Sequence, residues 1–180
     1  VEDEDVSAFV QKSFEKRGIE VMTGVKLKSV TSSKNKVVAI IDGSSSSLQA
    51  SRMILAVGII GNTENLGLEG TKIKTNDGHI VTNQWGATDE AGIYAIGDVT
   101  GPPWLAHKAS HEGVICVEKI AGQTDVHAIG VGAVPGCTYC RPQVASVGMT
   151  EAAATAAGYV LKVGRFPFQG NGKAIALGDD

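Results

Sequence analysis

The sequence has few of the residues that mark secreted, membrane-spanning or nucleic-acid-binding chains. Its 3 cysteines are an odd number without a secretion signal, which argues against a disulfide framework. No apolar run approaches the roughly 20 residues that a transmembrane helix needs. The 16 lysines and arginines form no basic stripe and are outnumbered by 19 acidic residues, so neither a nucleic-acid nor a membrane partner is expected. These absences favour a reducing compartment, the cytoplasm.

The sequence also lacks the usual features of finished ends. It begins at Val1–Glu4 without an initiator methionine and stops at Gly178–Asp180, directly after the strand-like run Lys173–Leu177. We therefore expect an excised piece of a longer protein.

Glycine is the residue type in clear excess, with 23 of 180 positions against a usual ~7%. The 5 prolines and one short serine run do not indicate a low-complexity or collagen-like chain. Glycines in a folded composition mark tight turns or close approach of the backbone to a ligand. In this sequence they are expected at strand ends and helix stops: Gly18, Gly58, Gly97, Gly122 and Gly158.

Periodicity in the first third predicts a helix followed by an antiparallel meander. Apolar residues at helical spacing, with acidic residues in the first turn, indicate a helix over 3–17 that Gly18 ends. Strand-like runs follow, with a turn at Asp42-Gly43, and the last run is wholly apolar and therefore expected to be a buried strand. The runs are Ile19–Met22, Val25–Thr31, Lys36–Asp42 and Met53–Val57.

The remaining sequence predicts short strands between two helices. The long helix is expected from Trp104 to Ala121, closed by Gly122, and a shorter one from Thr150 to Gly158. A hairpin turn is expected at 76–78. The expected strands are His79–Thr82, Ile93–Ile96, Val144–Val147, Tyr159–Phe166 and Lys173–Leu177. The predicted fold class is α/β, with an α+β mixture in this chain.

The segment most indicative of chemistry is the one that joins the run 93–96 to the long helix. A short buried strand ending in Gly97-Asp98 would place a carboxylate where open α/β sheets bind ligands, able to accept hydrogen bonds from sugar or ribityl hydroxyls. The free N–H groups of the helix start would face the same crevice and suit a group that becomes anionic, such as the pyrimidine edge of a reduced flavin. Taken alone, Asp98 could equally be a turn-capping residue.

The string Tyr94–Gly101 resembles the second flavin-binding motif of the pyridine nucleotide–disulfide oxidoreductases, an apolar run that ends Tyr-Ala-Ile-Gly-Asp. Within that family the sequence is most similar to the dihydrolipoyl dehydrogenases, flavoenzymes that oxidise protein-bound dihydrolipoamide with NAD as acceptor. The resemblance extends over essentially all 180 residues. It is also carried by Leu105–Ala109, Glu112-Gly113, Ala56–Gly58, Asn62-Thr63, Leu66–Glu69 and Val163–Phe168.

The resemblance implies which residues bind the cofactors FAD and NAD. Asp98 would bond the ribityl chain of FAD. The residues lying along the flavin, with backbone amides near its O2/N1 edge, would be Trp104, Leu105, Ala106 and His107. Gly58 would let NAD pass close to the backbone, and Leu27 would lie near its adenine side.

The resemblance also implies a domain organisation and partners. Residues 1–58 would be the later part of an NAD domain, residues 59–126 the returning segment of an FAD domain with its central helix, and residues 127–180 the start of a dimer-interface domain. The longer protein would be a homodimer that acts on the lipoyl domain of a 2-oxo-acid dehydrogenase complex.

Two segments depart from the family pattern. Ile59-Ile60-Gly61 replaces the usual Arg and Pro, which we interpret as a variant bacterial form, so the resemblance argues less strongly for dinucleotide contacts there. Cys140-Arg141-Pro142 replaces the common Thr-His-Pro. Arg141 is either a surface replacement, the interpretation we favour, or a local interface residue.

The family's catalytic parts have no counterpart in this sequence. They are a pair of cysteines beside the flavin, two glycine-rich phosphate-binding turns, and a histidine base oriented by a glutamate. We therefore expect no catalytic residue and no activity in this chain alone. The alternatives are a related disulfide reductase, of the glutathione or mercuric reductase type, and a non-catalytic dimerisation or interaction module.

Two patterns look like sites but fail on spacing or setting. Gly130–Pro135 has proline at the third glycine position of a dinucleotide fingerprint, and no helix is predicted after it. Cys137 and Cys140 form a C-x-x-C without a helix to lower a thiol pKa, so we expect two cysteines in an ordinary strand.

The long helix contains two further pairs at a spacing of four residues. His107 and His111 have a spacing that can bind metal, but zinc needs more ligands, so no metal site is expected. For His111 we expect a buried polar or interface role instead. Lys108 and Glu112 are expected to form a surface ion pair.

Overall fold

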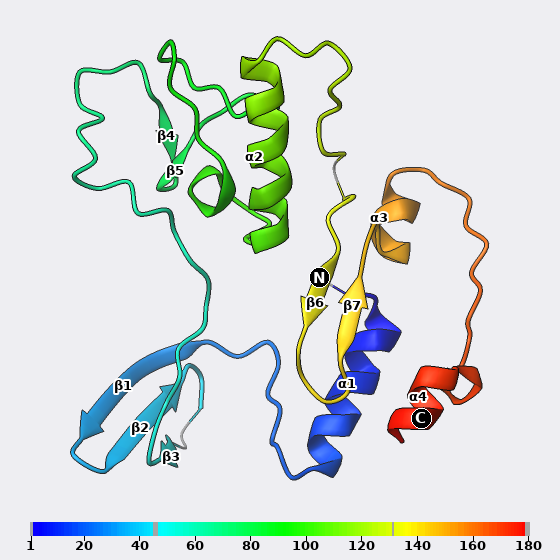
Figure 1. Ribbon diagram of the computed structural model, residues 1–180. Coiled ribbons are helices and arrows are strands. Elements are labelled where there is room, and N and C mark those ends of the chain that lie inside the picture. Colours follow the sequence, from blue (N-terminus) through cyan, green and yellow to red (C-terminus); the bar gives the residue numbers. More distant parts are fainter. Residues whose placement is uncertain (1, 45–46, 131, 179–180) are drawn as a thin grey trace. The chain divides into compact units, whose positions relative to one another are not determined.

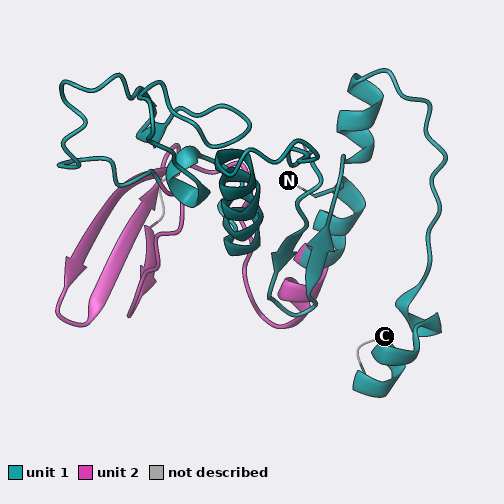
Figure 2. Cartoon of the chain, turned by 45° about the horizontal axis from the view of Figure 1, so that its top comes forward, with its two compact units in different colours: residues 1–10, 60–180 teal, residues 11–59 magenta. Residues whose placement is uncertain are grey.

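The structure is a computed structural model that describes residues 2–44, 47–130 and 132–178 (Figure 1). The chain divides into two compact units, one of residues 11–59 and the other of residues 1–10 and 60–180 (Figure 2). None of the helices in the described ranges has the length and apolar character needed to cross a membrane.

Helix α1 (Glu4–Lys16) confirms the helix predicted over 3–17. Acidic residues occupy its first turn and Lys16 its last, so the charges oppose the helix dipole. Gly18 follows with φ +82°. Its N–H donates to the carbonyl of Glu15 at 2.9 Å, and the N–H of Ile19 donates to the carbonyl of Phe14 at 3.1 Å. This pattern is a Schellman motif, which explains why the helix ends at the glycine.

The unit of residues 11–59 contains an antiparallel sheet with the strand order β1-β2-β3. Its strands are β1 (Leu27–Ser33), β2 (Lys36–Ile41) and β3 (Ser47–Ala50). The strands predicted at 25–31 and 36–42 are therefore confirmed as β1 and β2, which pair in a register with Val30 opposite Ala39. Gly43, at φ +72°, makes the predicted turn, whereas β3 was not predicted.

Two strand predictions in this unit are wrong. Residues 19–22 and 53–57 are not in strands, and Ile54 and Val57 are 90% and 85% exposed. An apolar run becomes a buried strand only when neighbouring strands satisfy its backbone and other elements cover its faces. Among the described residues no strand pairs with 53–57, because the sheet ends at β3.

In the other unit, the segment before the long helix forms a small hairpin. Strands β4 (Thr75–Asn76) and β5 (His79–Ile80) are antiparallel, and both Asp77 and Gly78 between them have positive φ, 47° and 78°. This confirms the predicted turn. The run 93–96 makes one isolated bridge, from Tyr94 to Ala87, rather than the predicted strand. The chain then forms the short 3-10 helix η1 (Gly97–Thr100).

The long helix α2 (Ala106–Ile120) confirms the helix predicted from 104 to 121, and Gly122 follows it with φ +78°. Beyond it, β6 (Gly136–Thr138) and β7 (Val144–Ser146) form a two-stranded antiparallel sheet. The strand predicted at 144–147 is thereby confirmed.

Helix α3 (Glu151–Ala156) also agrees with the prediction. The N–H of Ala153 donates to Thr150 Oγ1 at 3.1 Å, and Gly158 follows the helix with φ +85°. The cap and the glycine stop could both be inferred from the sequence because their residue types are specific to helix ends.

The last two strand predictions are wrong. Residues 159–166 form no strand, and Val160 is 98% exposed. Instead of a strand at 173–177, the short 3-10 helix η2 (Phe168–Gly170) is followed by helix α4 (Gly172–Leu177). Asn171 caps α4 by accepting hydrogen bonds from the N–H groups of Lys173 and Ala174, at 3.0 and 3.1 Å. A five-residue apolar run fits both secondary structures, and in this case the cap favours the helix.

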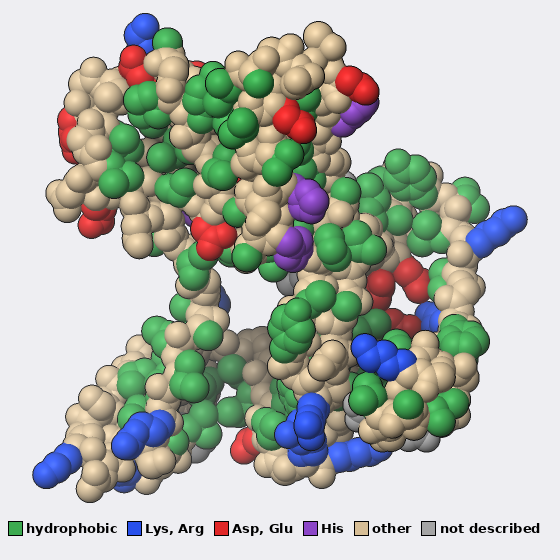
Figure 3. Space-filling model, viewed as in Figure 1, with side chains coloured by type: hydrophobic (Ala, Val, Ile, Leu, Met, Phe, Trp, Pro, Cys, Tyr) green, Lys and Arg blue, Asp and Glu red, His purple; other side chains and the backbone are tan. Residues whose placement is uncertain are grey.

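Hydrophobic side chains are widely exposed on the face drawn in Figure 3. Among the described residues the buried apolar side chains are Ile80, Cys116, Ala154 and Ala174. Ile80 lies in β5 and Cys116 in α2, and η1 contacts both of these elements. Two of these four side chains therefore lie in the part of the chain that holds the predicted flavin site.

Candidate functional site

The predicted flavin-binding residues lie where η1 leads into α2. Asp98 is in η1, where its carboxylate is exposed and has no hydrogen-bond partner among the described residues. η1 has no side-chain cap, and the side-chain hydrogen bond within this turn is that of Thr100, whose Oγ1 donates to the carbonyl of Gly97 at 2.8 Å. Asp98 therefore does not cap its own turn, and its carboxylate is free to accept hydrogen bonds from a ligand.

The start of α2 has no side-chain cap. Leu105 is the N-cap residue, with φ −137°, and no side chain accepts from the first turn of the helix. Ala106 and His107 are exposed. The N-terminus of a 15-residue helix carries free N–H groups and a partial positive charge. This end of α2 can therefore donate to an acceptor that becomes negatively charged.

The side chains of Trp104 and His107 are engaged by other parts of the same unit. The indole of Trp104 stacks on His79 with ring centroids 5.9 Å apart, and its Nε1 donates to His79 Nε2 at 3.3 Å. His107 Nε2 lies 2.8 Å from the carbonyl oxygen of Pro135. The sequence prediction missed His79, because a lone histidine in a hairpin strand carries no local signal of a contact 25 residues away.

The ion pair between Lys108 and Glu112 is present at 3.0 Å, but it is not on the surface as predicted. Lys108 is only 7% exposed and is buried beneath the η1 turn, where its Nζ also donates to the carbonyl of Gly101 at 3.2 Å. Glu112 Oε2 accepts from the N–H of Gly97 at 2.7 Å. The prediction followed the general rule that charged side chains on a helix are exposed to solvent, and Lys108 is an exception to that rule.

The small residues of α2 explain why this charged pair is covered. A Cβ on Gly97 would lie 3.1 Å from the Cβ of Ala109, and a Cβ on Gly113 would lie 3.2 Å from Ile96 Cδ1. Ala109 therefore lets the backbone at Gly97 approach the helix closely, and Gly113 makes room for the side chain of Ile96. The small residue that directly follows each charge, Ala109 after Lys108 and Gly113 after Glu112, was the sequence signal that could have revealed the burial.

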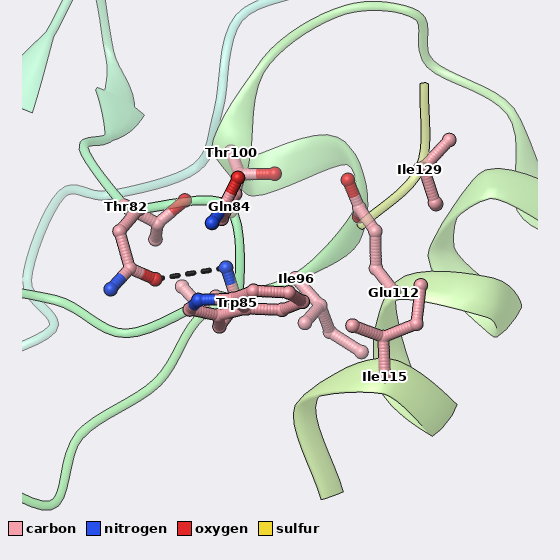
Figure 4. Close-up of a pocket in the computed structure, with 11 residues that line it drawn as sticks. Thr82, Gln84, Trp85, Ile96, Thr100, Glu112, Ile115 and Ile129 are labelled. Atoms are coloured by element: carbon pink, nitrogen blue, oxygen red, sulfur yellow. Dashed lines mark hydrogen bonds between the residues drawn. The ribbon is translucent and has the colours of Figure 1, made fainter. Parts of the chain in front are cut away.

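A cavity of about 150 Å³ lies beside this junction (Figure 4). Its walls include Trp85, Ile96, Thr100 and Glu112. Nucleotide and cofactor pockets are typically about 300–1,000 Å³. The cavity is too small for a dinucleotide and does not contain Asp98.

The two residues predicted to bind NAD belong to the unit of residues 11–59. Leu27 begins β1, is half exposed and pairs with Ile41. Gly58 is in an irregular segment rather than at the end of a strand, and it has φ +129° with no atom within 4 Å of the position of a Cβ. The backbone at Gly58 is thus open to close approach.

The remaining candidates are placed as follows. Cys137 is in β6, and Cys140 lies beyond the strand, with its Sγ 2.9 Å from the carbonyl oxygen of Pro142. His111 is exposed rather than buried. The segment 130–135 includes position 131, which lies outside the described residues. Among the described residues no group of three or more His, Cys, Asp or Glu side chains could hold a metal ion.

Comparisons with known proteins place this junction in a family. Residues 1–113 match the family described as pyridine nucleotide-disulphide oxidoreductase, and residues 134–180 match its dimerisation domain. A dihydrolipoyl dehydrogenase of Rhizobium etli is 55% identical over all of this chain, and one of Zymomonas mobilis is 49% identical over 99% of it. The chain spans 38% and 39% of the length of these two relatives.

A solved structure supports the same assignment. The crystal structure of LpdA from Mycobacterium tuberculosis matches 99% of this chain with a TM-score of 0.87 and 26% identity, and 39% of the LpdA chain is covered. The structural likeness therefore extends over both units. Because the family match alone covers residues 1–113 of 180, the chain belongs to the pyridine nucleotide-disulphide oxidoreductase family.

Proposed function

We propose that these residues are part of a dihydrolipoyl dehydrogenase, a flavoenzyme that oxidises protein-bound dihydrolipoamide and passes the electrons through FAD to NAD. The observation that carries the proposal is the junction of η1 and α2, where a carboxylate without a partner among the described residues is followed along the chain by an uncapped helix start. The relatives that are 55% and 49% identical to this chain are named dihydrolipoyl dehydrogenases.

The chemistry of the junction fits FAD. The exposed carboxylate of Asp98 is an acceptor for the ribityl hydroxyl groups, and the N–H groups at the start of α2 are donors for the O2/N1 edge. When bound, FAD supplies the two-electron acceptor of the reaction. The role of Trp104, Leu105, Ala106 and His107 is to present backbone N–H groups along the ring rather than to react with it.

For NAD we propose Gly58 and Leu27. Gly58 has a positive φ and open space at its Cβ position, which supports close approach of a dinucleotide to the backbone. Leu27 offers a half-exposed apolar surface of the kind that packs against an adenine ring.

We infer no catalytic residue within this chain. The family reaction needs a cysteine pair beside the flavin and a histidine base, and the setting of Cys137 and Cys140, without a helix to lower a thiol pKa, does not match such a pair. Cys116 is buried in α2, and Cys137 and Cys140 lie in and next to β6. We therefore expect the 180-residue chain alone to be inactive.

The proposed partners are a second copy of the protein and the lipoyl domain of a 2-oxo-acid dehydrogenase complex, and the proposed location is the bacterial cytoplasm. The match of residues 134–180 to a dimerisation domain supports the homodimer. Light scattering on the complete gene product, meaning the product of the whole reading frame that contains these 180 residues, should find a dimer. A monomer at all concentrations would contradict this part of the proposal.

Asp98→Ala tests the proposed flavin site in the complete gene product. Removing a charged acceptor from the ribityl hydroxyls should raise the Kd for FAD by about tenfold to a hundredfold. Asp125→Ala is the matched control, because Asp125 is also exposed but lies outside the junction. Equal FAD affinities of the wild type and Asp98→Ala would refute the assigned role of Asp98.

A further inference from the structure

Lys108 is the one charged or polar side chain among the described residues that is buried. A buried ammonium group is costly unless it is paired and hydrogen-bonded. Lys108 satisfies this requirement with the carboxylate of Glu112 at 3.0 Å and the carbonyl of Gly101 at 3.2 Å. Lys108 and Glu112 therefore stabilise each other within the fold, and neither side chain is among the proposed contacts to the flavin.

The pair reaches both ends of the η1 turn. Glu112 projects from α2 (Figure 4) and accepts from the N–H of Gly97, the first residue of the turn, at 2.7 Å. Lys108 donates to the carbonyl of Gly101, the residue that follows the turn. Asp98 lies between these two attachment points. The two charges thus join the backbone on either side of Asp98 to adjacent turns of one helix.

The attachment of the η1 backbone to α2 matters for Asp98 because no hydrogen bond within the described residues fixes the Asp98 side chain. The carboxylate is exposed and unpartnered among the described residues, so its position follows from the backbone of η1. That backbone approaches Ala109 closely at Gly97, and the side chain of Ile96, just before the turn, lies against Gly113, so packing limits the distance of the turn from α2. The hydrogen bonds of the ion pair add a directional restraint at each end of the turn.

We propose that Lys108 and Glu112 are positioning residues, a partly buried clamp that holds the η1 turn so that Asp98 meets the ribityl chain of FAD. This inference rests on the proposed function. The clamp acts through the backbone of 97–101. Its contribution to flavin binding therefore depends on the Asp98 carboxylate being present.

The test is a double-mutant cycle in the complete gene product, with the Kd for FAD measured by reconstitution of the apoprotein. Glu112→Gln keeps the shape of the side chain but removes the negative charge that pairs with Lys108. It should weaken FAD binding by about tenfold, the value of a hydrogen bond to a charged group. In the Asp98→Ala background the same change should weaken binding by no more than about twofold, the usual margin for independent sites.

Glu118→Gln is the matched control, since Glu118 is an exposed acidic residue on the same helix, and it should leave the Kd unchanged. Lys108→Met provides a second route if Glu112→Gln does not fold, because it removes the buried charge and should show the same dependence on Asp98. A melting temperature for each variant separates loss of fold from loss of FAD affinity.

Three results would overturn the clamp. The first is an unchanged Kd for FAD in Glu112→Gln or, where that variant does not fold, in Lys108→Met. The second is an equal loss of affinity with and without the Asp98 carboxylate, which would mean that the pair supports the fold and not the position of Asp98. The third is an unchanged Kd in Asp98→Ala, which would also refute the role of Asp98 in the proposed flavin site. The first two results would refute the clamp alone, so failure of the clamp can be told apart from failure of the flavin site.

Discussion

At the scale of single residues, Gly97 is the position where backbone and packing demands coincide. Its φ of +75° is in the left-handed region, and a Cβ there would lie 3.1 Å from the Cβ of Ala109. For a non-glycine residue the left-handed conformation alone costs about 1–2 kcal/mol of folding free energy. At Gly97 the contact with α2 adds a second cost.

Gly97→Ala should therefore destabilise the complete gene product more than Gly92→Ala. Gly92 has a similar φ of +80° but no atom within 4 Å of its Cβ position, so it isolates the backbone cost of about 1–2 kcal/mol. The comparison is a pair of melting temperatures. Equal decreases in the two variants would show that η1 does not press against Ala109.

Some residues of the site could be predicted from the sequence and others could not. Asp98 and the start of α2 follow from a local motif and from the helix pattern. The burial of Lys108 and the stacking of His79 on Trp104 depend on which segment folds back on which, and no local pattern specifies this. The ion-pair spacing of Lys108 and Glu112 was predicted correctly, while its environment was not.

At the scale of elements, an ion pair joins α1 to the segment that follows α3. Arg165 donates to Asp5 Oδ2 at 2.9 Å from Nη2 and at 3.2 Å from Nε. The hydrogen bond from Arg165 lowers the pKa of the Asp5 carboxyl below its ordinary value, and the positive charge of Arg165 lowers it further. Because the folded pKa is depressed, the pair stabilises the chain above the unfolded pKa of about 3.9 and is lost as pH falls through the folded value.

Arg165→Met should therefore raise the pKa of Asp5 toward its ordinary value. An NMR titration of the Asp5 carboxyl, in the wild type and the variant, measures this directly. Lys162→Met is the control, since Lys162 is exposed and is not a cause of the Asp5 shift. The same Asp5 pKa with and without Arg165 would show that the two side chains are not paired in solution.

Helix α4 offers a second prediction at this scale. Asn171 accepts hydrogen bonds from the N–H groups of Lys173 and Ala174. Asn171→Ala should destabilise α4 by about 1 kcal/mol, which for a helix of 6 residues is a large share of its local stability. Amide exchange of residues 173–177 should become faster. Unchanged exchange rates would indicate that Asn171 does not cap this helix.

The elements that could be predicted are those whose ends are set by their own residues. Gly18, Gly122 and Gly158 each follow a helix in the left-handed conformation that glycine favours, and Thr150 caps α3. The strands expected at 53–57 and 159–166 failed for a different reason. A strand needs hydrogen-bonding partners from elsewhere, and the described residues supply none at these positions.

At the scale of the whole molecule, the exposed apolar runs are explained if further chain covers them. Ile54, Val57 and Val160 are each at least 85% exposed. The chain spans only 38% of the length of its Rhizobium etli relative. Apolar surface of this extent favours burial against another part of a protein.

We therefore expect residues 53–57 to be protected from hydrogen exchange in the complete gene product and unprotected in the isolated 180-residue chain. Residues 108–116 of α2 serve as the internal reference, because they are hydrogen-bonded within a helix in this chain already. Equal exchange at 53–57 in both proteins would show that no additional chain covers the run.

The most direct test of the account is turnover by the purified complete gene product with dihydrolipoamide and NAD. We predict formation of NADH at a rate that depends on bound FAD, and no NADH from the isolated 180-residue chain under the same conditions. Reduction of glutathione disulfide with a reduced nicotinamide cofactor as electron donor, in place of this reaction, would identify a related reductase. Absence of turnover from a correctly folded, flavin-loaded gene product would contradict the assignment as a dihydrolipoyl dehydrogenase.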